Sequence, residues 1–259
     1  MIEIYLCQIP KLLPLSEEEL QKYSAHHRSS TRQKRHESII SHLCLDLVYQ
    51  HKFGTPPPLI AYSPSGKPYF TDSVVSFNIS HSGELVALAI SDSPTPLGID
   101  VQLEVDRTRA DKLLNRYGKY INPLPLKVCE HKKDAPKFFR ASITGQSSGS
   151  PTLSPSPLDI ASMDATDTQS ITQNTEKSLP LVGIAEDNVN DRLQIYKTPI
   201  KELSEFLPLW TSAEAVLKAE GSGLGGLCLL GDVIRDYALW CFVICLDGNR
   251  YSLSLAEKL

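Results

Sequence analysis

Residues 74–103 decide the expected fold; they read VVSFNISHSGELVALAISDSPTPLGIDVQL. Three apolar-rich runs, at 74–79, 84–91 and 97–103, are separated by short segments that contain Gly, Ser and Pro. Short apolar runs bounded by these turn-favouring residues are typical of β-strands. We therefore predict three consecutive strands in this part of the chain.

The rest of the chain alternates between strand-like and helical stretches. Strands are expected at 2–8, 227–230, 237–246 and 251–255, and helices at 32–51 and 201–220, with a short helix beginning at Ser16. Groups of strands that alternate with groups of helices are typical of an α+β fold. We therefore predict an α+β protein with an N-terminal half at residues 1–105 and a C-terminal half at residues 106–259.

The stretch from about 141 to 180 has a different composition. About half of it is Ser, Thr, Pro or Gly, it contains no aromatic residue, and Lys177 is its only basic residue. Such a segment buries too little apolar surface to offset the entropy lost on ordering. It is predicted to be a disordered or loosely ordered insertion, or alternatively an internal linker.

The overall composition favours a globular enzyme. The chain has 259 residues, of which 41% are hydrophobic and 22% charged, enough for one large domain or two small ones. The net charge of −4 gives no indication of a nucleic-acid partner. A local basic cluster is either a solvated helix face or an anion-attracting lip beside a pocket. Its members are His26, His27, Arg28, Arg32, Lys34 and Arg35.

Cysteine usage and the N-terminus indicate a cytoplasmic protein. None of the six cysteines forms a Cys-x-x-Cys pair, so reduced thiols are expected. Residues 1–6 alternate like a strand and lack the pattern of a signal peptide. No run of about 18 apolar residues is present, so we expect no membrane span.

Two motifs near the predicted strands carry chemistry. Ser80 and His81 can grip a phosphate with help from Lys67, although a buried histidine bonded to a backbone carbonyl is the commoner fate of such a residue. Asp100 follows an apolar residue within a strand, where an unpaired charge is costly to bury. It is therefore either a ligand of a hard cation or a cap of the following turn.

A third motif lies on the second long helix. Glu214 and Lys218 are four residues apart, so they share one face and form either part of a site or an exposed ion pair. The Gly-rich segment 221–226 that follows matches G-x-G-x-x-G in letters, but it follows a helix and not a strand. A dinucleotide-binding loop is therefore not expected.

In combination these blocks resemble a known family. Residues 66–68, 77–82, 98–100 and 210–224 resemble the signature blocks of the 4′-phosphopantetheinyl transferases, in the large monomeric class that activates nonribosomal peptide synthetases. The order of the four blocks and the spacing of the first two agree with that family. The resemblance does not extend to the segment from about 106 to 203.

The resemblance implies both a fold and an activity. The fold would consist of two similar α+β halves related by a pseudo-twofold, with coenzyme A in the cleft between them. The activity would be transfer of the phosphopantetheine arm of coenzyme A to a serine of an acyl or peptidyl carrier protein, with release of adenosine 3′,5′-bisphosphate. A cytoplasmic monomer that depends on magnesium is expected.

The resemblance also implies residues that bind coenzyme A. Ser80 and His81 would hold the 3′-phosphate, and Lys67 would lie along the nucleotide. Lys218 would neutralise charge on the pyrophosphate as the bond to the leaving group breaks. The basic cluster near Arg32 resembles the anion-binding helix of the family, so Arg32 would be a further contact to coenzyme A.

The remaining implied residues concern the metal and the base. Asp100 and Glu214 would bind magnesium on the pyrophosphate, with Gln102 offering a neutral oxygen. Glu214 would take the proton of the incoming serine directly or through water, since a serine hydroxyl is a weak nucleophile.

Two positions depart from the family pattern and leave a second hypothesis open. Gln102 stands where a second acid is common, and Ala213 where a lysine is common. Some relatives manage without that acid, and Glu104 is a possible substitute for it. The chain is therefore either an active transferase or a degenerate protein that holds coenzyme A and turns it over poorly. A serine hydrolase that uses Ser80, His81 and Asp100 is disfavoured, because adjacent side chains of a strand point to opposite faces and no Gly-x-Ser-x-Gly elbow is present.

Overall fold

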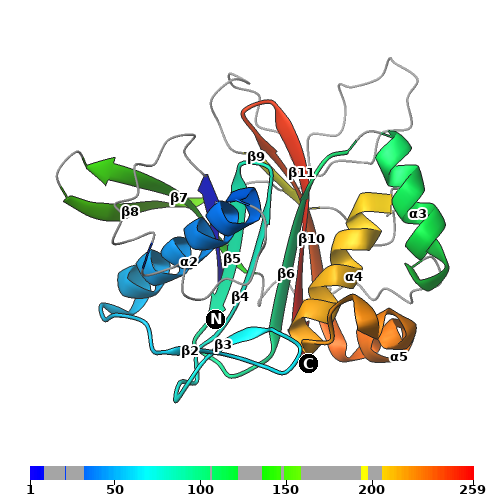
Figure 1. The fold of residues 1–259 in the computed structure, drawn as a ribbon, viewed down its shortest axis with the longest axis horizontal. Helices are drawn as coiled ribbons and strands as arrows, with labels where there is room; N and C mark the ends of the chain where they lie inside the picture. The colour runs from blue at the N-terminus through cyan, green and yellow to red at the C-terminus, as the bar shows by residue number, and fades with distance from the viewer. Residues whose placement is uncertain are drawn as a thin grey trace, which may run out of the picture.

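The computed structural model describes residues 1–8, 21, 32–105, 107–121, 136–146, 149–158, 194–197 and 206–259. The expected helix that begins at Ser16 lies outside these residues. Helices and strands occur together, so the predicted α+β class is confirmed (Figure 1). No helix within these ranges is long and apolar enough to cross a membrane.

Most of the predicted elements are present. The strands are β1 (Ile2–Gln8), β2 (Ile60–Tyr62), β3 (Pro68–Phe70), β4 (Ser76–Ser82), β5 (Leu85–Ser91), β6 (Leu97–Leu103), β7 (Lys137–Gln146), β8 (Gly149–Leu158), β9 (Gln194–Lys197), β10 (Tyr237–Leu246) and β11 (Asn249–Lys258). The helices are α2 (Arg32–Phe53), α3 (Arg107–Ile121), α4 (Phe206–Glu220) and α5 (Leu230–Val233), with 3-10 turns η3 (Gly223–Leu229) and η4 (Ile234–Asp236). The three strands predicted within 74–103 are confirmed as β4, β5 and β6.

The strands form two main sheets and a small hairpin. The first sheet has the order β4-β5-β1-β7-β8, the second has the order β6-β11-β10-β9, and β2 pairs with β3. Only the β1–β7 pair is parallel among the described strands; the other pairs are antiparallel. Strand β6 is therefore an edge strand of the second sheet.

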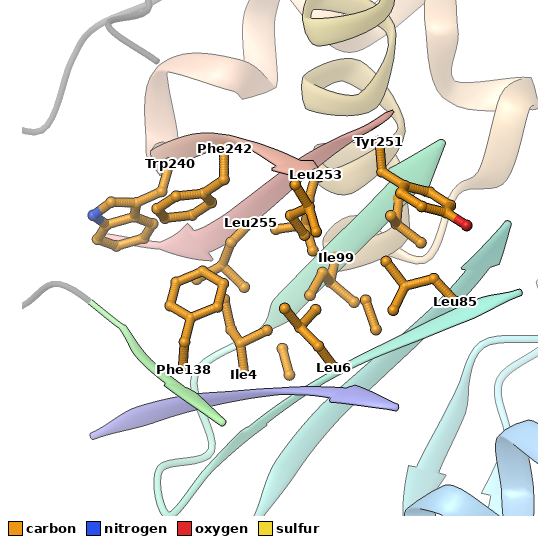
Figure 2. Close-up of a cluster of buried hydrophobic side chains, with 14 of the residues drawn as sticks. Ile4, Leu6, Leu85, Ile99, Phe138, Trp240, Phe242, Tyr251, Leu253 and Leu255 are labelled. Atoms are coloured by element: carbon orange, nitrogen blue, oxygen red, sulfur yellow. The ribbon is translucent and has the colours of Figure 1, made fainter. Parts of the chain in front are cut away.

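The two sheets are stacked face to face around an apolar core (Figure 2). Strand β1 places Ile4 and Leu6 in this core, and Tyr5 on the opposite face of the sheet. From the second sheet, Trp240 and Phe242 point back toward β1 and β7. Successive side chains of a strand point to opposite faces, so every second side chain lies in the shared core.

A helix covers the outer face of each sheet (Figure 1). Helix α2 packs Ile40 and Leu43 against the first sheet, and α4 packs Val216 and Leu217 against the second. The result is a four-layer arrangement of helix, sheet, sheet and helix. Because α4 lies on the second sheet, its residues 214 and 218 come near β6.

The two sheets share part of their connectivity. In the first sheet, β1 is followed by α2, by the hairpin β2–β3 and then by β4 and β5; in the second, β6 is followed by α3 and β7 to β9, then by α4, and after η3, α5 and η4 by β10 and β11. The strand order of β1, β4 and β5 matches that of β6, β10 and β11, because the last strand of each set lies between the other two. A pseudo-twofold relation in space stays a prediction. The division of the chain into halves at 1–105 and 106–259 does not coincide with the sheets, since β6 belongs to the second sheet and β7 to the first.

Part of the predicted insertion at 141–180 is wrong. Residues 141–146 continue β7, which pairs with β1, and residues 149–158 form β8, which pairs with β7. Strand pairing uses backbone groups, so a Ser- and Thr-rich segment can form it without apolar side chains. Strand β8 is the edge of its sheet, a position that tolerates prolines such as Pro155. Residues 159–180 lie outside the described ranges.

The predicted strand at 227–230 is also wrong, because this run lies in η3 and the start of α5. A short apolar run does not distinguish a strand from a buried helical turn.

Strand β6 crosses α4 at very close range. A Cβ atom on Gly98 would lie 1.8 Å from the backbone oxygen of Ala215 and 2.6 Å from the backbone nitrogen of Ala219. Neither atom can move without displacing the helix, so only glycine fits at position 98.

Gly98→Ala is therefore expected to destabilise the fold strongly, by about 3 kcal/mol or more, since overpacking against backbone forces the strand and helix apart. Urea denaturation measures this loss. Gly225→Ala is the matched control, because a Cβ at Gly225 meets no atom within 4 Å. If the two variants unfolded at the same urea concentration, the close contact between β6 and α4 would be contradicted.

Candidate active site at the free edge of strand β6

The free edge of β6 is bonded to side chains and not to another strand. Strand β4, from the other sheet, lies beside this edge, and alternate side chains of β4 accept hydrogen bonds from alternate amides of β6. The pairs are Ile99 N–H to Asn78 Oδ1 (2.8 Å), Val101 N–H to Ser80 Oγ (3.2 Å) and Leu103 N–H to Ser82 Oγ (2.9 Å). Unpaired edge amides are thereby satisfied where the two sheets meet.

Two lysines bond to carbonyl groups of β6. Lys218 Nζ donates to the carbonyl oxygen of Ile99 (3.2 Å), and Lys67 Nζ donates to that of Leu97 (3.1 Å). Lys67 Nζ also donates to the carbonyl oxygen of Ala219 (2.6 Å) in the last turn of α4, where carbonyls lack helical partners. Burial lowers the pKa of Lys67 to about 8, and the charge of Glu220 opposes this effect. Lys67 thus ties the turn before β3 to α4 and β6.

Asp100 is the centre of the cluster. Its side chain is 4% exposed, and Oδ1 accepts hydrogen bonds from Lys218 Nζ (2.6 Å) and Ser80 Oγ (2.9 Å). The ion pair provides the compensation that a buried carboxylate requires. The partner of Lys218 is thus Asp100 of the strand, and not only the helix neighbour Glu214 that the four-residue spacing suggested.

The hydrogen-bonding capacity of Ser80 and Lys218 is fully used within the protein. Ser80 Oγ donates to Asp100 and accepts from Lys218 (2.9 Å) and from the amide of Val101. A hydroxyl has one donor and two acceptor positions, so none is left. Lys218 likewise directs its three protons to Ser80, Ile99 and Asp100. A phosphate that binds either group must displace one of these partners.

The second oxygen of Asp100 is different. Oδ2 is buried and has no hydrogen-bond partner in the part of the chain that the structure describes. Glu214 lies beside it, and its pKa is raised to about 8, first by burial, then by the negative charge of Asp100, and also because its protonated form can donate a hydrogen bond to that carboxylate. The charge of Lys218 acts in the opposite direction. Oδ2 therefore lacks a donor once Glu214 is ionised. The two carboxyl groups therefore compete for the positive charge of a single lysine.

The donor set fits a hard divalent cation. One buried carboxylate oxygen without a partner, beside a second carboxyl group held in its neutral form, is an arrangement that a dication would relieve. No group of three or more His, Cys, Asp or Glu side chains that could hold a metal is present among the described residues. Two carboxyl groups suit magnesium, which keeps several waters and takes further ligands from phosphate.

The predicted third ligand, Gln102, lies two residues after Asp100 on the same face of β6. Its Nε2 donates to Ser82 Oγ (3.2 Å) and to the carbonyl oxygen of Leu103 (3.2 Å). These bonds engage the amide nitrogen, whereas a cation would bind the amide oxygen. The metal-ligand role of Gln102 stays a prediction.

The structure does not bring the side chains of Ser80 and His81 to one face. Ser80 points toward β6, whereas the His81 side chain is 38% exposed, with Nδ1 3.8 Å from Glu37 Oε2 on α2. Burial lowers the pKa of His81, and the carboxylate of Glu37 opposes this effect. A Ser-His-Asp hydrolase triad is therefore disfavoured, and of these two residues His81 is the one open to a phosphate. Arg32 begins α2, and its side chain lies outside what the structure describes.

Sequence reasoning missed Asn78 and Ser82 as parts of this cluster. The available signal was the alternation Asn78-x-Ser80-x-Ser82, in which the apolar residues Phe77 and Ile79 take odd-numbered positions. Polar residues at every second position predict one polar face, and the structure turns that face toward the amides of β6.

A comparison with protein-family models and a search of curated proteins find no match to this chain. The site is therefore interpreted from its own geometry together with the resemblance of its motifs.

The free energy of unfolding is expected to fall between about pH 4.5 and pH 8 through Glu214. Its pKa rises from 4.5 to about 8 on folding, so the folded state binds the extra proton in this range and loses that advantage as the pH rises. Thermal denaturation between pH 5 and pH 9 measures the slope. Glu214→Gln is expected to flatten it and to be more stable than the wild type at pH 9. An unchanged slope in Glu214→Gln would refute the raised pKa.

Proposed function

We propose that this chain transfers the phosphopantetheine arm of coenzyme A to a serine of an acyl or peptidyl carrier protein, as a magnesium-dependent 4′-phosphopantetheinyl transferase. The observation that carries the proposal is the buried, unpartnered Oδ2 of Asp100 beside Glu214, with Lys218 on the other oxygen. Two acids and one lysine from the two motifs that resemble the family thus come together at one point.

The residues have defined roles in this reaction. The serine oxygen of the carrier protein forms a bond to the phosphorus that bears the pantetheine arm. The bond from that phosphorus to the leaving oxygen breaks, and adenosine 3′,5′-bisphosphate leaves with the electron pair. Glu214 accepts the proton of the serine hydroxyl, and the positive charge of Lys218 stabilises the negative charge that develops on the phosphates.

Asp100 and Glu214 would hold the magnesium ion, with Gln102 as a further oxygen ligand. When bound, such an ion neutralises charge on the pyrophosphate and favours attack at phosphorus. Lys218 would share the Asp100 carboxylate with that ion and would then be available to a phosphate oxygen. Glu214 must lose its proton before it can act as ligand or base, and a neighbouring dication lowers its pKa.

The residues expected to contact the nucleotide differ in how accessible they are. His81 is exposed near the cluster and can meet a 3′-phosphate, whereas Ser80 and Lys67 are engaged with protein groups. A carrier-protein partner, a monomeric state and a cytoplasmic location belong to the same proposal and rest on the resemblance.

A degenerate coenzyme A-binding protein is the second candidate function. The observation that favours it is the complete internal bonding of Ser80 and Lys218, together with Gln102 in place of a second acid. One assay separates the two candidates. The protein is incubated with coenzyme A, magnesium and an apo carrier domain, and the carrier domain is examined by mass spectrometry.

The wild type is expected to add the mass of one phosphopantetheine arm to the carrier domain. Asp100→Asn and Glu214→Gln are expected to reduce the rate by at least about 100-fold, since each removes a charged group from the reacting centre. Asp232→Asn, at an exposed position of α5, serves as the control and keeps the wild-type rate. Binding of coenzyme A without any mass gain would favour the degenerate protein, and full activity in Glu214→Gln would exclude the proposed base.

Magnesium is expected to raise the melting temperature of the wild type, because a ligand that binds only the folded state stabilises it. The increase should be larger at pH 8.5 than at pH 6, since Glu214, with its pKa of about 8, must release its proton to bind the ion. Asp100→Asn should show no increase at either pH. An increase of the same size in Asp100→Asn would place the ion elsewhere.

A further inference from the structure

We propose that Asn78, Ser80 and Ser82 are positioning residues that form a side-chain ladder along the free edge of β6. This ladder holds β6 in register with β4, and its middle member Ser80 fixes the Asp100 carboxylate. The second part rests on the proposed function of Asp100, whereas the ladder itself does not.

The first argument is the regularity of the contacts. Three successive even-numbered side chains of β4 accept from three successive odd-numbered amides of β6, with donor–acceptor distances between 2.8 and 3.2 Å. Each bond joins positions separated by 21 residues in sequence, so the register is constant along the ladder. A constant register over three pairs is the pattern of a strand ladder, with side-chain oxygens in place of carbonyl oxygens.

The second argument is the placement of the two strands. Strand β4 is at the edge of the first sheet and β6 at the edge of the second, and the sheets are stacked on a shared core. Stacked sheets lie about 10 Å apart, but a serine side chain and one hydrogen bond span only about half of that distance, so β4 and β6 come closer together at this edge. Short polar side chains on the inner face of β4 then make the bonds to the amides of β6.

The third argument is the double role of Ser80. Its oxygen accepts from the Val101 amide and donates to Oδ1 of the preceding residue, Asp100. These two bonds tie backbone and carboxylate of β6 to one atom of β4. Oδ1 is thereby engaged, and Oδ2 is left as the oxygen without a partner beside Glu214. Ser80 thus acts through Asp100 and does not need to touch a substrate.

The ladder is tested by amide hydrogen exchange measured by NMR. In an antiparallel sheet, alternate amides point to opposite sides, so the amides of Gly98, Asp100 and Gln102 face β11 and serve as internal references. In Ser80→Ala the Val101 amide should exchange about five to ten times faster relative to these references, the effect of one lost hydrogen bond. In Ser82→Ala, at a less buried position, the Leu103 amide should respond in the same way.

Ser76→Ala is the matched control. Ser76 lies on the same strand and the same face as the ladder, but its hydroxyl donates to the carbonyl oxygen of Ser93 and not to β6. It should leave the amides of β6 unchanged. Equal acceleration of reference and ladder amides in Ser80→Ala, or no acceleration, would overturn the ladder.

The positioning of Asp100 is tested by titrating Mn²⁺, followed by its electron paramagnetic resonance signal. Ser80→Ala should bind Mn²⁺ about tenfold more weakly than the wild type. Ser76→Ala should bind Mn²⁺ as tightly as the wild type. Ser80→Thr keeps the hydroxyl group and should therefore have most of the wild-type affinity. Equal affinity in Ser80→Ala and wild type would overturn the positioning role. Absence of Mn²⁺ binding to the wild type would contradict the proposed function, and the exchange pattern would then decide the ladder alone.

Discussion

The unpaired edge of β6 is the constraint on which the site depends. Backbone groups at a sheet edge must find partners when another part of the chain covers them. Here the partners are side chains of Lys67, Asn78, Ser80, Ser82 and Lys218, which come from the turn before β3, from β4 and from α4. The sequence motifs assign three of them, Lys67, Ser80 and Lys218, to a phosphate-binding site. The same side chains therefore hold the two sheets together, and two of them, Ser80 and Lys218, bond to Asp100.

The electrostatics of the cluster follow from burial. Asp100 is nearly inaccessible, and one lysine cannot neutralise both it and Glu214. Glu214 consequently takes up a proton near neutral pH, which leaves a neutral carboxyl group beside a carboxylate. Such a pair is stable when empty but can accept a dication with release of that proton. Lys218, which is about one-third exposed, is the member of the cluster best placed to change partners.

The sequence predicted the parts of the fold in which pattern and local geometry coincide. Strand β6 has the predicted bounds, and α2 and α4 occur at the predicted helices, because burial on one side imposes the strand and helix periods. Strands β7 and β8 were missed because their pairing is made by backbone groups, which composition does not reveal. At the site, the conjunction of Asp100, Glu214 and Lys218 was predicted. The engagement of Ser80 with Val101 was not, since it depends on how two sheets stack.

The close crossing of β6 over α4 explains why the two acids meet at all. Gly98 and Asp100 lie on the same face of β6, and Ala215 and Ala219 follow Glu214 and Lys218 directly on α4. Because position 98 has no side chain, the strand rests on the helix backbone, and Asp100 comes within 2.6 Å of Lys218 Nζ. A side chain at position 98 would lift the strand from the helix and lengthen both this ion pair and the approach to Glu214. The glycine of the Gly98-Ile99-Asp100 motif therefore sets the distance between Asp100 and the helix, without supplying any group of its own.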